Sequence, residues 1–104
     1  MGKSAAIGLL LTSSPESENR RTVMKISEAA LRQGHRVRIF LMYDGVYHIL
    51  RDDFMELADR GVEIILCAYD ADQRKVPRRE GVLFGSQYDL SEMVAKGDAF
   101  LSFH

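Results

Sequence analysis

The chain alternates between short apolar runs and longer amphipathic segments. The apolar runs cover residues 5–11, 35–42, 62–67 and 99–103, and the second of them begins with alternating polar residues. Runs of this length that are rich in Ile, Val, Leu and Phe and bounded by polar residues are typical of strands buried in a parallel sheet. The pattern therefore predicts a strand at each of these runs.

Three segments between the runs carry apolar residues at helical spacing. The first is predicted to start at Ser14-Pro15, where a hydroxyl cap precedes a proline, and to end at Gly34. Similar signals give the limits of the other two, which are Asp52 or Asp53 to Gly61, and Asp89, with Glu92 as its capping partner, to Gly97. Residues 43–48 are expected to form a loop. Residues 70–85 show no regular period.

Strands that alternate with helices favour an α/β fold with a parallel sheet and right-handed crossovers. We predict a three-layer α/β/α arrangement, flavodoxin-like, with a mainly parallel sheet of four to five strands. A length of 104 residues fits one domain that spans residues 1–104.

The charge balance and the cysteine count narrow the possible partners and the compartment. The net charge is −1, with 14 basic and 15 acidic residues, which argues against stable binding to a nucleic-acid backbone. No apolar segment has the length of a membrane span or the pattern of a signal peptide, so we expect a cytosolic protein without membrane contact. A single cysteine cannot form an intramolecular disulfide, and in the cytosol it stays reduced unless it is used.

That cysteine, Cys67, ends the third apolar run and is the first candidate for chemistry. Reactive groups of open α/β sheets gather at the carboxyl ends of the strands. Nearby cations favour a thiolate, and Tyr69, Arg74 and Lys75 follow closely enough to be candidates for supporting it. The alternative is that Cys67 is a small buried hydrophobic residue at the end of a core strand.

A second candidate cluster follows the second predicted strand and contains Asp44, Tyr47 and His48. If the two strands end at the same edge, these residues line the same pocket as Cys67. The alternative is a turn with a packed tyrosine. The histidines and the cysteine lack the spacing of a metal site. The Thr12–Ser14 loop lacks the glycines of a phosphate-binding loop, so helix capping is the better explanation for it.

Four segments together resemble the DsrE/DsrF family of small sulfur-relay proteins, which has TusD-like and YchN-like members. The segments are Gly34-His35-Arg36-Val37, Asp44-Gly45-Val46-Tyr47, Cys67 at its strand end, and the tail from Gly85 to Phe103. The resemblance spans nearly the whole chain. After Cys67 the sequence differs from the closest sulfur carriers, which tend to have a small-residue helix that ends in Arg-Gly.

The resemblance implies that Cys67 accepts sulfane sulfur as a persulfide and passes it to a partner's thiol, as a sulfurtransferase in sulfur oxidation or tRNA thiolation. It implies sulfur-donor and sulfur-acceptor proteins as partners and a homo-oligomer that is a dimer, trimer or hexamer. Exchange of this kind needs no cofactor or metal. The alternative is a non-catalytic oligomeric binding or assembly module in which Cys67 is structural. A small nucleotide- or phosphate-binding protein is a third hypothesis.

Overall fold

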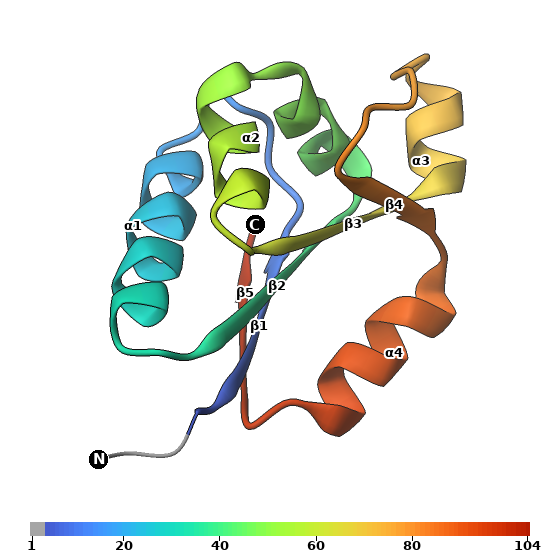
Figure 1. Cartoon of the computed structure of the whole chain (residues 1–104). Coiled ribbons are helices and arrows are strands. Elements are labelled where there is room, and N and C mark those ends of the chain that lie inside the picture. Colours follow the sequence, from blue (N-terminus) through green and yellow to red (C-terminus); the bar gives the residue numbers. More distant parts are fainter. Residues whose placement is uncertain (1–3) are drawn as a thin grey trace.

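The computed structural model describes residues 4–104 and contains one sheet with helices on both of its faces (Figure 1). Its elements, in chain order, are β1 (Ala6–Leu11), α1 (Asn19–Arg32), β2 (Arg36–Leu41), the 3-10 helix η1 (Tyr43–Leu50), α2 (Asp52–Asp59), β3 (Glu63–Cys67), α3 (Ala68–Gln73), β4 (Val82–Gly85), α4 (Gln87–Lys96) and β5 (Ala99–Phe103). The four predicted strands and the α/β class are confirmed.

All the strands are parallel, in the order β4-β3-β2-β1-β5. Leu9 in the interior strand β1 is paired with Ile39 on one side and with Leu101 on the other. The chain adds strands outward from β1 to β4 and then crosses back through α4 to place β5 on the opposite side of β1. The fifth strand, β4, lies within the segment for which the sequence pattern gave no regular period.

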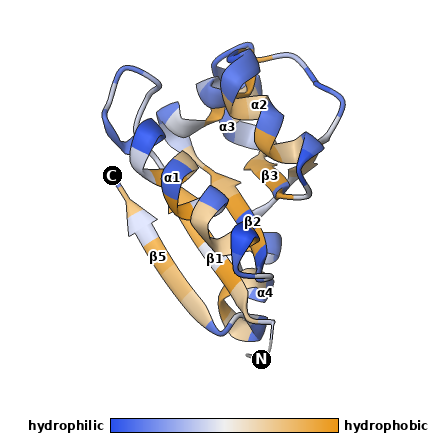
Figure 2. Ribbon diagram, turned by 60° about the vertical axis from the view of Figure 1, so that its left-hand side comes forward, coloured by the Kyte–Doolittle hydropathy of each residue, from blue (hydrophilic) through white to orange (hydrophobic). Residues whose placement is uncertain are grey.

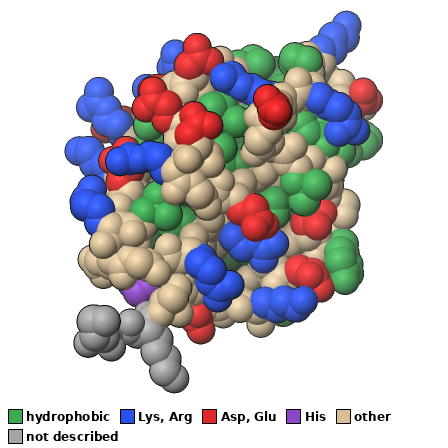
Figure 3. All heavy atoms as spheres, in the orientation of Figure 1, with side chains coloured by type: hydrophobic (Ala, Val, Ile, Leu, Met, Phe, Trp, Pro, Cys, Tyr) green, Lys and Arg blue, Asp and Glu red, His purple; other side chains and the backbone are tan. Residues whose placement is uncertain are grey.

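The two faces of the sheet are covered unequally. One face packs against α1, α2 and η1, and its side chains form the larger core cluster, which includes Leu9, Ile39 and Phe54. The other face packs against α4, around a small cluster of Phe40, Ile65, Cys67 and Met93. Figure 2 shows hydrophobic residues concentrated on the strands, and Figure 3 shows acidic and basic side chains intermixed on the face that it draws.

Two predicted helix ends are confirmed in detail. Gly34 follows α1 with φ +84°, and Gly61 follows α2 with φ +104°. In each case the amide of the glycine and the amide of the residue after it donate hydrogen bonds to carbonyls at the end of the helix. The His35 N–H, for example, donates to the Ala30 carbonyl. This is the Schellman arrangement, which requires the left-handed backbone that glycine adopts without strain.

Two predicted helix starts are wrong. The Ser14-Pro15 signal marks a turn, in which Ser17 N–H donates to the Ser14 carbonyl, and α1 begins only at Asn19. The first amides of α1 do not need Ser14, because the Ser17 hydroxyl accepts from Asn19 N–H. In α4 the cap is Ser86, three residues before Asp89. The Asp89 carboxylate accepts a hydrogen bond from the Ser86 amide, which completes a capping box.

Residues expected to be loop are partly helical. Residues 43–48 lie within η1, and α3 follows β3 without an intervening loop. Among residues 4–104, no helix combines the length and the apolar character needed to cross a bilayer.

Candidate functional site

Cys67 ends β3, and its side chain lies on the face of the sheet that α4 covers. The residue is 7% exposed and belongs to the small hydrophobic cluster with Phe40, Ile65 and Met93. Its sulfur accepts a hydrogen bond from the backbone N–H of Asp70, with 3.5 Å between nitrogen and sulfur. The thiol therefore has a polar donor on the side of α3 and apolar side chains on the side of α4.

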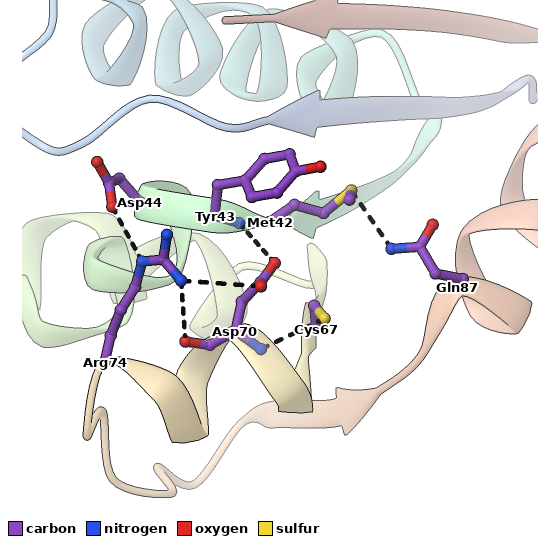
Figure 4. A network of polar contacts seen from close by, with 7 residues as sticks. All are labelled: Met42, Tyr43, Asp44, Cys67, Asp70, Arg74 and Gln87. Atoms are coloured by element: carbon purple, nitrogen blue, oxygen red, sulfur yellow. Dashed lines mark hydrogen bonds and ion pairs between the residues drawn. The ribbon is translucent and has the colours of Figure 1, made fainter.

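The carboxylate of Asp70 ties the segment after β2 to α3. One carboxylate oxygen accepts from the backbone N–H of Tyr43 at 2.8 Å, and the other lies 3.7 Å from the Arg74 guanidinium. Arg74 also donates to the Asp44 carboxylate at 2.9 Å and to the Asp70 carbonyl at 3.4 Å (Figure 4). The Asp44 carboxylate raises the pKa of Arg74, so this guanidinium remains charged. Arg74 thus neutralises two carboxylates, one of them the buried Asp70.

Met42 and Gln87 complete the surroundings of the thiol. Met42 packs against the small cluster that contains Cys67, and its sulfur accepts a weak 3.8 Å hydrogen bond from the Gln87 side chain. Gln87 is the first residue of α4, and Met42 immediately precedes the strained Tyr43, whose φ is +51°. The sequence pattern did not identify Met42, Tyr43 or Gln87 as part of the site. The signal that could have found Asp70 is its place three residues after Cys67, with Arg74 a further helical turn away.

The structure brings Asp44, but not Tyr47 or His48, into the Cys67 network. Tyr47 is half-buried and lines a separate depression of about 620 Å³ together with Asp44 and Arg51. The expectation that His48 lines the Cys67 pocket is wrong, because its ring is fully buried. It packs against Phe54, with 5.0 Å between ring centroids, on the opposite face of the sheet from Cys67.

The two remaining candidates lie at the surface. Tyr69 is 70% exposed, and Lys75 is exposed and forms no ion pair with any residue from 4 to 104. Arg74 is the only one of the three downstream candidates that joins the network, and it reaches Asp70 instead of the sulfur. In the part of the chain that the structure describes, no three His, Cys, Asp or Glu side chains are grouped so that they could hold a metal ion.

A family model described as the DsrE/DsrF-like family matches residues 5–103. The chain belongs to this family. None of the curated proteins compared with this DsrE/DsrF-like chain matches it. Among solved structures, the crystal structure of the ychN protein from E. coli is similar, with a TM-score of 0.84 and 24% identity, over 95% of this chain and 99% of that one. At this identity the similarity establishes a shared fold.

Within this fold, Cys67 is not at the point where the strand order reverses. That point lies between β1 and β5, and it is where open α/β sheets usually bind nucleotides. Cys67 lies at the end of β3, between β2 and β4. The candidate site, which consists of the Cys67 thiol and the Asp70 amide that donates to it, therefore lies away from the usual nucleotide-binding position.

Proposed function

We propose that this DsrE/DsrF-like protein is a sulfur-relay protein, a sulfurtransferase that carries sulfane sulfur as a persulfide on Cys67 and passes it to a partner's thiol. The observation that carries the proposal is the hydrogen bond from the Asp70 backbone to the Cys67 sulfur at the carboxyl end of β3. Membership of the family supports it, since the resemblance in sequence implies this chemistry.

The reaction is an exchange between thiolates. The Cys67 thiolate attacks the outer sulfur of a donor persulfide, R–S–SH, so that a bond forms between Cys67 and that sulfur while the donor's S–S bond breaks. The donor leaves as R–S⁻, and the protein holds Cys67–S–SH. An acceptor thiolate then attacks the same outer sulfur and regenerates the Cys67 thiolate. No electrons are gained or lost overall, so the exchange needs no cofactor or metal.

One backbone hydrogen bond to the Cys67 sulfur is already in place for this cycle. A hydrogen bond that a backbone N–H donates becomes stronger when the accepting sulfur is negative, and the Asp70 N–H holds that position before the reaction starts. The partners in the proposal are a sulfur-donor and a sulfur-acceptor protein. The working form is a homo-oligomer in the cytoplasm.

The alternative function is a non-catalytic assembly module in which Cys67 only packs. The observation that favours it is the apolar surroundings of the thiol, which belongs to one hydrophobic cluster with Phe40, Ile65 and Met93 and is 7% exposed. The two functions differ in one measurable property, which is whether the native protein loads sulfur on Cys67.

The test is the mass of the intact native protein after incubation with inorganic polysulfide. We expect a gain of one sulfur atom that a reductant reverses and that the Cys67→Ser variant lacks. Because the chain has one cysteine, this variant is a complete control, and its circular dichroism spectrum should match that of the wild type. An adduct that forms only on the urea-unfolded chain would contradict the relay and support the assembly module.

A further inference from the structure

Asp70 connects to the Cys67 site in two ways. Its backbone N–H donates to the sulfur of Cys67, and its side chain accepts from the backbone N–H of Tyr43. The residue is 7% exposed, and its side chain faces Arg74, which balances its charge. A carboxylate this deeply buried is costly unless its oxygens are satisfied, and here Tyr43 and Arg74 satisfy one each.

The partner backbone, Tyr43, is strained. Its φ of +51° lies in the left-handed region, where the Cβ of a non-glycine residue crowds the backbone. Such a conformation persists only where the surroundings over-determine it. The bond from the Tyr43 amide to Asp70, 2.8 Å long and charge-assisted, is the contact that holds it.

The backbone conformation of Tyr43 affects the position of the preceding residue, Met42. Met42 ends the extended segment and packs against the cluster of Cys67, while Gln87 on α4 holds the Met42 sulfur from the other side. Figure 4 shows Met42, Tyr43, Asp70 and Cys67 gathered around the end of β3. If Tyr43 relaxed to negative φ, the path of the chain after β2 would change, and Met42 would shift against the cluster that contains Cys67.

From these contacts we infer that Asp70 is a positioning residue, whose carboxylate latches Tyr43 in the left-handed conformation and thereby controls access to Cys67. The latch keeps the thiol covered, and release of the Tyr43 amide uncovers it. This inference rests on the proposed function, because control of access matters only if Cys67 reacts. It adds to that function a defined closed state and the bond that must break to open it.

The test measures how fast iodoacetamide alkylates Cys67 in the folded protein, across a series of low urea concentrations. We expect Asp70→Ala to raise the rate roughly tenfold or more, because hydrogen bonds to charged groups contribute at least that factor to an opening equilibrium. The increase should depend only weakly on urea, since a local opening exposes little surface. The matched control is Asp72→Ala, which removes an exposed carboxylate of the same helix and should leave the rate unchanged.

The strain at Tyr43 gives a second test that does not alter Asp70. Tyr43→Ala and Tyr43→Gly both remove the ring, but only glycine removes the strain. We expect the glycine variant to be alkylated more slowly than the alanine variant, by roughly fivefold or more. Glycine at position 43 should also recover part of the protection that Asp70→Ala loses. The two Tyr43 variants keep the inference testable if Asp70→Ala does not fold. Asp70→Asn, which retains an acceptor, should then be alkylated at a rate between that of the wild type and that expected for Asp70→Ala.

Equal rates in the wild type and Asp70→Ala would overturn the inference, as would an increase that follows global unfolding in its urea dependence. Polysulfide loading of the wild type separates this result from the proposed function. Loading without any effect of Asp70 on alkylation rejects the latch alone. Alkylation that responds as expected, without loading, rejects the relay alone.

Discussion

The Nε2 atom of His48 lies 2.8 Å from the carbonyl oxygen of Ser13, although 35 residues separate them in the chain. The imidazole N–H therefore fixes the loop after β1 against η1 from inside the core. The other ring nitrogen, Nδ1, has no hydrogen-bond partner among residues 4–104. The ring is therefore neutral in the folded protein, and burial lowers the pKa of His48 to about 4.

This neutral histidine makes stability depend on pH. The unfolded chain takes up a proton near pH 6.5, whereas the folded protein does so only near pH 4, so the free energy of unfolding falls as the pH drops from 6.5 to 4. The size of the loss is on the order of 2 kcal/mol. His48→Gln keeps a donor for Ser13 but does not titrate, so urea unfolding at pH 7 and pH 4.5 should show a smaller loss in this variant. An equal loss in both proteins would contradict a buried neutral His48.

We expect Gly45→Ala to destabilise the protein by several kcal/mol, in the range of a severe core substitution. A Cβ atom at position 45 would overlap the backbone carbonyl of Leu11, which is fixed in β1 between two paired strands. Gly8→Ala is the matched control, because its Cβ would meet the flexible Met93 side chain, 2.8 Å from Cγ, and that chain can move. Urea denaturation should rank Gly45→Ala well below Gly8→Ala. A reversed order would mean that η1 does not approach β1 this closely.

Lys75→Gly is expected to stabilise the protein by about 1 kcal/mol. Lys75 follows α3 with φ +57°, and the amides of Lys75 and Val76 fold back onto the helix as they do after α1 and α2. Glycine adopts this conformation without the cost that a side chain brings. Thermal unfolding should show a higher midpoint in Lys75→Gly, and Lys75→Ala, which keeps the strain, is the control.

Ser86→Ala should cost about 1 kcal/mol of stability, as the loss of a helix cap usually does. The Ser86 hydroxyl accepts from Tyr88 N–H at 3.2 Å, and the Asp89 carboxylate accepts from Ser86 N–H at 2.8 Å. Ser91 lies exposed within the same helix, so Ser91→Ala should be neutral or slightly stabilising. Chemical denaturation of the two variants compares the cap with a helical position of the same residue type. Similar stabilities would argue against Ser86 as the cap of α4.

The elements that could be predicted without the structure are those whose signals are local in the chain. Buried strands such as Glu63–Cys67 could be predicted from apolar runs alone, and Gly34 and Gly61 from the need for a left-handed backbone at a helix end. The place of Cys67 at the carboxyl end of its strand follows from the same run. These features depend on residues within a few positions of each other, so no distant contact is needed to predict them.

The contacts between distant segments could be seen only in the folded chain. The helix start was predicted at Ser14 but lies at Asn19. The loop before it is held by a hydrogen bond between His48 and the Ser13 carbonyl, which are far apart in the chain. The four residues of β4 form a strand because β3 offers them a free edge, not because of their own pattern. The carboxylate of Asp70 accepts a hydrogen bond from the Tyr43 amide, which follows the neighbouring strand β2. Hydrogen bonds and packing between such segments leave no local pattern, which is why the surroundings of Cys67 came from the fold and Cys67 itself from the sequence.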